Sequence, residues 1–150
     1  MSLLVPTGRR PAAREVSISK DNLMNLEKVV FGFFITMAAA LNFGFWYGPI
    51  SEPAMHNGAE LMAALVTSLI ATVLKFGDRT QLGAVHLSTS LVADLQLIVG
   101  VIVWVICSEM TTTGLTSTHI SVVVSLSAGA MLANAVSVVL MVGELLQARR

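Results

Sequence analysis

The chain has 150 residues and a mass of 15.9 kDa, with 55% apolar residues, 12% charged residues and a mean hydropathy of +0.78. Nine basic residues balance nine acidic ones, whereas an ordinary soluble domain has roughly 25% charged residues. This composition excludes a soluble enzyme, a disordered chain and a nucleic-acid binder, because no net basic field attracts phosphate. It indicates an integral membrane protein of the all-α class.

The segment before the first apolar run, residues 1–22, has the composition of a mobile cytoplasmic tail. It contains Pro6, Pro11 and dispersed charges, and it lacks the apolar core of a signal peptide. The transmembrane domain is therefore expected over residues 23–150. Its first helix is predicted near 27–48, because residues 29–51 contain no Asp, Glu, Lys or Arg and are long enough to cross a hydrocarbon core of roughly 30 Å.

Three further helices complete a predicted polytopic bundle of four transmembrane helices, and they lie near 60–76, 82–108 and 119–147. The first of these is the shortest, at the lower limit of ~17 residues for a spanning helix. The second is interrupted only by Asp94, and residues 110–143 again contain no Asp, Glu, Lys or Arg.

All nine Lys and Arg residues fall on one side of such a four-helix arrangement. They lie before the first helix, at the turn after the second helix and at the C-terminus, whereas the opposite loops carry acids and histidines. The positive-inside rule then predicts an N-in/C-in topology, with both termini in the cytoplasm. Lys75, Asp78 and Arg79 are expected to form solvated pairs at the inner interface.

Small residues recur every four positions on three of the predicted helices, and residues four apart share one helix face. Helices in lipid associate through such close-packing faces and through buried polar contacts, because apolar burial does not drive them together. The stripes fit packing within one bundle, and their number on so small a chain also favours a homo-oligomer. The predicted helix-packing residues are Gly32, Ala40, Gly44, Ser68, Ser125, Gly129 and Ala133.

Asp94 is the main candidate for a functional residue, since it is predicted about 17 Å into its helix at 1.5 Å per residue. An aspartate near the bilayer midplane costs on the order of 3 kcal/mol to insert, which hydrogen bonds, a cation, hydration or protonation must offset. Asn42 and Asn134 are predicted at similar depth, and Ser90 and His86 follow on the same helix face toward the cytoplasm. These residues suggest a polar path for protons or hydrated cations. The alternative is that Asp94 only fixes the packing.

A second polar group is predicted in the outer loops and consists of Glu52, Glu60 and Glu109. In an oligomer these acids would form a ring that attracts cations. The simpler interpretation is that outer loops carry acids because basic residues are excluded there. A zinc site at His56, Glu60 and His119 is less favoured, because no tighter cluster surrounds them, so no metal is expected.

No nucleotide-binding, hydrolase or metalloprotease motif occurs in the sequence, so neither enzymatic activity nor a cofactor is expected. The single cysteine, Cys107, excludes an internal disulfide and has no base predicted beside it.

Two stretches resemble a family of small, functionally uncharacterised four-helix inner-membrane proteins of proteobacteria: NFGFWYG and ELMAALVTSLIATVLKFGDRTQLGAVHLSTSLVADLQLI. The likeness covers about residues 26–150. It implies a multi-pass protein of the bacterial cytoplasmic membrane and supplies no activity.

The sequence therefore leads to two functional hypotheses for a protein whose surroundings are the lipid bilayer. The first is a homo-oligomeric channel or carrier for cations or protons with an intramembrane aspartate. The second is a non-catalytic accessory or assembly subunit of a larger membrane complex, attached through its small-residue stripes.

Overall fold

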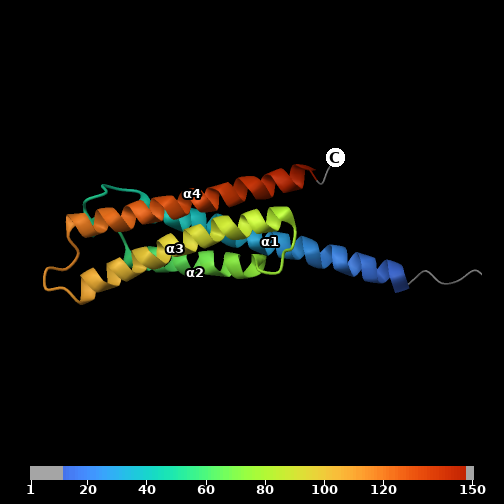
Figure 1. Ribbon diagram of the computed structural model, residues 1–150, viewed down its shortest axis with the longest axis horizontal. Helices are drawn as coiled ribbons and strands as arrows, with labels where there is room; N and C mark the ends of the chain where they lie inside the picture. Colours follow the sequence, from blue (N-terminus) through green and yellow to red (C-terminus); the bar gives the residue numbers. More distant parts are fainter. Residues whose placement is uncertain (1–11, 148–150) are drawn as a thin grey trace, which may run out of the picture. The chain divides into compact units, whose positions relative to one another are not determined.

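The computed structural model describes residues 12–147, with side chains from residue 26 onward (Figure 1). Its elements in chain order are α1 (Ala12–Trp46), the short 3-10 helix η1 (Pro53–Met55), α2 (Gly58–Lys75), α3 (Gln81–Glu109) and α4 (Ser117–Gln147). The predicted all-α class is confirmed, since the described residues contain no strand. Each of the four α-helices holds a segment long and apolar enough to cross a membrane, so the chain is a multi-pass membrane protein.

The chain divides into two units, Met1–Val30 and Phe31–Arg150, and each is described by itself. In the first unit α1 already begins at Ala12, so residues 12–22, which were expected in the tail, are helical. This segment contains no proline or glycine that would end a helix, and its charged residues do not oppose helix formation. The remainder of the predicted tail, residues 1–11, lies outside the described residues.

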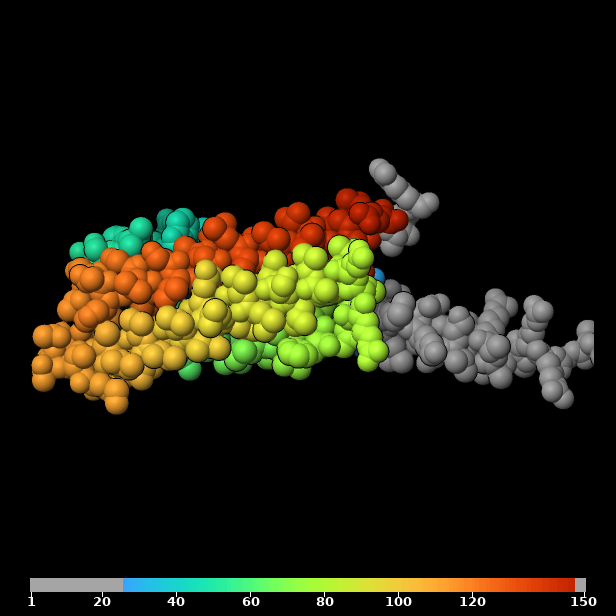
Figure 2. All heavy atoms as spheres, viewed as in Figure 1, coloured from blue at the N-terminus to red at the C-terminus, as the bar shows by residue number. Residues whose placement is uncertain are grey.

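Within the second unit, α3 packs against both α2 and α4. Figure 2 shows α3 and α4 side by side along one face, from the turn before α3 to the loop before α4. The largest apolar cluster joins residues of all four helices, and its bulkiest members are Phe45, Leu61, Leu97, Ile120, Val123 and Val124. These residues lie toward the end where α1 and α3 finish, so apolar packing is concentrated there.

The buried residues of the second unit follow a spacing of three and four positions. In α1 they are Phe31, Ile35, Ala38, Asn42 and Phe45. In α4 they include Ile120, Val123, Ser127, Ala130, Asn134 and Ser137. An alternation of three and four gives the seven-residue period of helices that cross at small angles and interlock their side chains.

Several of the predicted helix-packing residues lie outside the buried face that this three-four spacing defines. Ser68 is fully buried, whereas Ala40, Gly44 and Ser125 are exposed in the single chain. Gly32, Gly129 and Ala133 are half-buried. Two of these glycines are covered by long side chains, Gly32 by Met141 and Gly129 by Gln96. Some of the predicted helix-packing residues therefore lie in contacts between helices, and others lie on the outer surface of the bundle.

The outer surface of the bundle is apolar, while much of its interior is polar. Val73, Leu95 and Val139 are 70%, 64% and 69% exposed, respectively, on the outside of α2, α3 and α4. A soluble protein of this size does not expose large apolar side chains over the length of every helix. The arrangement fits a lipid environment, in which the polar groups are the ones that must be turned inward.

Candidate functional site: the polar interior of the bundle

The helices of the second unit place several polar side chains inside the bundle. All are buried: Asn42, Ser68, Thr72, His86, Ser90, Asp94, Ser127, Asn134 and Ser137. They occupy interior positions of the three-four pattern, so the same periodicity that buries the apolar core also places them. Asp94 is the only acidic residue among the buried side chains of the described chain.

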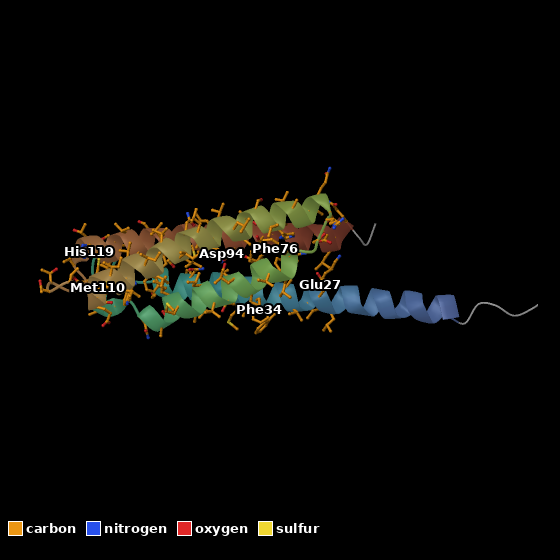
Figure 3. All side chains as sticks on the ribbon, turned by 60° about the horizontal axis from the view of Figure 1, so that its bottom comes forward. Glu27, Phe34, Phe76, Asp94, Met110 and His119 are labelled. Carbon is orange, nitrogen blue, oxygen red and sulfur yellow. The ribbon has the colours of Figure 1, made fainter. Side chains whose placement is uncertain are left out.

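Asp94 lies near the middle of α3 and is 4% exposed. Figure 3 labels it between Phe76, which follows α2, and the end of the bundle with Met110 and His119. Its Oδ2 accepts a hydrogen bond of 2.6 Å from the hydroxyl of Thr72 on α2. Its Oδ1 is buried and has no hydrogen-bond partner among the described residues. One carboxyl oxygen is thus fixed by a hydrogen bond, and the other is available for a further bond.

Thr72 was not among the predicted site residues. Its Oγ1 lies 3.1 Å from the carbonyl oxygen of Ser68 as well as 2.6 Å from Asp94. A hydroxyl group has one hydrogen for these two acceptors. A protonated Asp94 would satisfy both contacts, because the acid would donate to Thr72 and Thr72 to Ser68. The geometry of this contact therefore fits a protonated carboxyl group.

Ser90 and His86 occupy the two preceding interior turns of α3 and are fully buried. The hydroxyl oxygen of Ser90 and both ring nitrogens of His86 are without hydrogen-bond partners in the described part of the chain. The His86 ring meets the ring of Phe31 edge-on, with 5.3 Å between the centroids. The row His86, Ser90 and Asp94 that the sequence predicted thus lies on one interior face.

Asn42 and Asn134 are also fully buried, but no hydrogen bond joins either of them to Asp94. Asn42 instead accepts a bond of 3.0 Å from Ser127 on α4 through its Oδ1. Its Nδ2, and both polar atoms of the Asn134 side chain, are unpartnered within residues 26–147. The three residues of the predicted polar layer therefore share the interior of the bundle but do not bond to one another. Ser127 also belongs to this interior and was not predicted from the sequence.

Unpartnered polar atoms on this scale are unusual inside a protein. A buried donor or acceptor without a hydrogen bond costs roughly 1–3 kcal/mol, and native structures normally satisfy such atoms with protein groups or ordered water. In the described chain they include one carboxyl oxygen, of Asp94, and both ring nitrogens of His86. This combination of groups is suited to hydration and to proton exchange.

The end of the bundle at the α2–α3 turn is closed by Lys75, Asp78 and Phe31. Lys75 is 5% exposed, so the solvated pair expected from the sequence is a largely buried one. Its Nζ donates to Oδ2 of Asp78 at 3.2 Å and lies 4.6 Å from the centre of the Phe31 ring. The ammonium group can be buried because the carboxylate of Asp78 and the face of the Phe31 ring together compensate its loss of hydration.

Asp78 is held by the start of α3. It accepts from the backbone N–H of Thr80 at 3.0 Å and from the hydroxyl of Thr80 at 2.7 Å, and that hydroxyl accepts from the N–H of Gly83. A Cβ on residue 83 would overlap the carboxyl group of Asp78, so a larger residue there would displace Asp78 from these bonds. Burial raises the pKa of Asp78, but the bonds from Thr80 and Lys75 outweigh burial and lower it below the ordinary 3.8.

This lowered pKa predicts an acid-sensitive turn. The stabilisation from Asp78 is complete above its unfolded-state pKa, ordinarily 3.8, and is lost as the pH falls through the lower pKa of the folded state. Detergent-solubilised protein should therefore lose thermal stability as the pH falls below about 4, and Asp78→Asn should weaken this dependence. An unchanged pH profile in Asp78→Asn would assign the acid sensitivity to another group.

The other end of the bundle is closed by His56, which was considered above as a zinc ligand. The chain turns there at Gly48, whose φ of 133° is favourable only for glycine. The His56 side chain is buried between two carbonyl oxygens, with Nδ1 2.6 Å from that of Phe45 and Nε2 3.1 Å from that of Pro49. Its ring also packs on Phe45, which in turn meets Trp104. In its neutral form the ring has one N–H, so it donates to one of these two carbonyl groups and thereby holds the loop on the end of α1.

The predicted outer acids do not form one cluster. Glu52 and Glu109 are exposed, and the half-buried Glu60 places its carboxylate against Gly44 of α1. Among the described residues, no group of three His, Cys, Asp or Glu side chains is placed to hold a metal ion. A cation-attracting ring built from these acids would depend on several copies of the chain.

The comparison with known protein families gives a match over residues 55–145, to a family of unknown function, DUF6394. The matched part contains all of α2 and α3 and most of α4, and therefore Thr72, His86, Asp94 and Asn134. No curated protein and no solved structure matches the chain. Because the match spans more than half of the sequence, the chain belongs to the DUF6394 family.

Proposed function

We propose that this protein is a small channel or carrier for protons or cations in the bacterial cytoplasmic membrane, with both termini in the cytoplasm. The proposal rests on the position and the contacts of Asp94. It is a buried carboxyl group at the middle of a membrane-spanning helix, with one oxygen bonded to Thr72 and the other unpartnered among the described residues. Ionisable residues at such a position are costly and are most often kept for transport or proton transfer.

In this proposal the path runs through the interior of each bundle. His86 and Ser90 lead from the α2–α3 turn to Asp94, while Asn42 and Asn134 supply polar groups from α1 and α4. Phe31 with Lys75 closes one end and His56 with Phe45 the other, so access requires that these side chains move. The test is ion flux into liposomes that contain the purified protein, compared with empty liposomes and with the Asp94→Asn variant.

A second proposal, an accessory or assembly subunit of a larger membrane complex, is favoured by small residues on the outside of the bundle. Ala40 and Gly44 on α1 and Ser125 on α4 are exposed in the single chain. Small exposed residues on membrane helices allow another helix to approach closely. The same surfaces would serve a homo-oligomer, which is the assembly that we propose for a channel.

Purification in a mild detergent distinguishes these assemblies. We expect a symmetric homo-oligomer, seen by size-exclusion chromatography with light scattering, and a smaller species when the exposed Ala40 is changed to leucine, because the larger side chain blocks close approach. Gly143→Leu is the matched control, since no side chain or distant backbone atom lies within 4 Å of a Cβ at residue 143. Co-purification of other membrane proteins in stoichiometric amounts, with no homo-oligomer, would support the accessory subunit instead.

A further inference from the structure

The polar interior offers little to a metal ion. Hard cations such as Mg²⁺ or Ca²⁺ are bound by six or more oxygen atoms, several of them from carboxylates or water. Asp94 is the only buried acid in the described chain, and its one hydrogen-bonding neighbour is a hydroxyl group. His86, Ser90 and Asn134 are fully buried, so a hydrated ion has no open passage between them.

A positive charge also lies at one end of this interior. The ammonium group of Lys75 is buried on the interior face of α2, one turn from Thr72. It contacts Phe31, the same ring that contacts His86. A metal cation that enters from this end would meet the ammonium group before it reached Asp94. The carboxylates of Asp78 and Glu144, which also act on His86, offset that charge.

The same interior has the groups that proton transfer requires. An imidazole accepts a proton on one nitrogen and releases one from the other, and both nitrogens of His86 are unpartnered among the described residues. His86, Ser90 and Asp94 are four residues apart in turn, which corresponds to a rise of about 6 Å per step. The side-chain atoms of His86 and Ser90 have no hydrogen-bond partner among the described residues, so no direct bond joins these groups and each step needs a bridging water molecule.

From these observations, and resting on the proposed function, we infer that the transported species is the proton and not a metal cation, and that His86 relays it between the α2–α3 turn and Asp94. His86 takes up a proton at one ring nitrogen, becomes an imidazolium and releases the proton of the other nitrogen toward Ser90 and Asp94. The ring is then neutral in its other tautomer, and a ring flip restores the first. One proton has moved, and no electron is transferred.

The test uses the full-length protein in liposomes, with an internal pH-sensitive dye for protons and radioactive Na⁺ and K⁺ analogues for metal ions. We expect the protein to dissipate a pH gradient and to admit neither Na⁺ nor K⁺ above the level of empty liposomes. His86→Gln should lower the proton flux roughly a hundredfold, the scale of a lost acid–base group. His119→Gln is the matched control, because His119 lies in the first turn of α4, away from the polar interior.

A purely structural role of His86 is tested by a second variant. Glutamate has nearly the shape of glutamine but can carry a proton, so His86→Glu should retain a measurable proton flux where His86→Gln does not. Equal fluxes in the two variants, or a normal flux in both, would overturn the relay. Na⁺ or K⁺ uptake comparable with proton uptake would overturn the selectivity and leave the proposed function standing. No flux of any ion through the unaltered protein would instead refute the proposed function itself.

Discussion

Asp94→Asn is expected to lower proton flux into liposomes about a hundredfold or more, while the protein remains folded. Asparagine has the shape of aspartate and keeps an oxygen that accepts the hydrogen bond from Thr72, which is 2.6 Å in the unaltered protein. It does not gain or lose a proton at neutral pH, so a path through this residue is interrupted. The measurement is the rate at which an imposed pH gradient decays, normalised to the amount of protein in the membrane.

Three further variants make this result specific. Asp94→Glu keeps a carboxyl group and should retain part of the flux, whereas Asp94→Leu should abolish it. Glu27→Gln removes an exposed carboxyl group from α1 and should leave the flux close to normal. If Asp94→Asn and Asp94→Leu both conduct like the unaltered protein, Asp94 is a packing residue and the accessory subunit becomes the better proposal.

Asp78→Ala is expected to lower the free energy of unfolding by about 1–3 kcal/mol. The substitution removes the acceptor of two hydrogen bonds from Thr80 and one from Lys75, and it leaves the Lys75 ammonium group buried without its carboxylate partner. A buried charge that has lost its partner is more destabilising than an apolar side chain in the same place. Unfolding by SDS in mixed micelles, followed by circular dichroism, measures the effect.

The double variant Lys75→Met/Asp78→Ala separates the ion pair from the other bonds of Asp78. Methionine fills a similar volume without charge, so the double variant should be more stable than Asp78→Ala alone. Arg79→Ala changes an exposed neighbour and should alter the unfolding free energy by less than about 0.5 kcal/mol. A double variant no more stable than Asp78→Ala would show that the buried ammonium group is not the source of the loss.

The four helices were predictable from the sequence because a charge in the lipid core is costly whatever the tertiary contacts of its helix. Long windows without Asp, Glu, Lys or Arg therefore locate the spans before any contact is known, and the shortest, α2, was found within two residues of its observed start. Asp94 was found by the same criterion, as the one charge inside a long apolar run.

It was harder to predict which side of each helix is buried in the bundle. On α4 the sequence pattern favoured Ser125, Gly129 and Ala133, whereas the fully buried polar face carries Ser127 and Asn134. A four-residue repeat drifts around a helix, while the packed bundle selects positions spaced three and four apart. Small residues do not distinguish the two faces, because they suit both a close contact and an exposed surface.

The interior contacts of Thr72 and Lys75 were missed for a related reason, although Lys75 was expected at the inner turn. Their environment depends on α1 and α3, since Thr72 bonds Asp94 and Lys75 packs over Phe31. Neither contact has a local signal in the sequence of α2. The three-four spacing of Ser68, Thr72 and Lys75 was the only available indication that they share one face.

The unpartnered atoms of the interior give the bundle spare hydrogen-bonding capacity. Nine buried side-chain atoms of the described chain have no partner, and they include donors and acceptors from all four helices. When a single interior bond is removed, a neighbouring group can replace it, as the carbonyl oxygen of Ser68 can for Thr72. Thr72 can therefore exchange its bond to Asp94 for the bond to Ser68 while α2 and α3 stay in place.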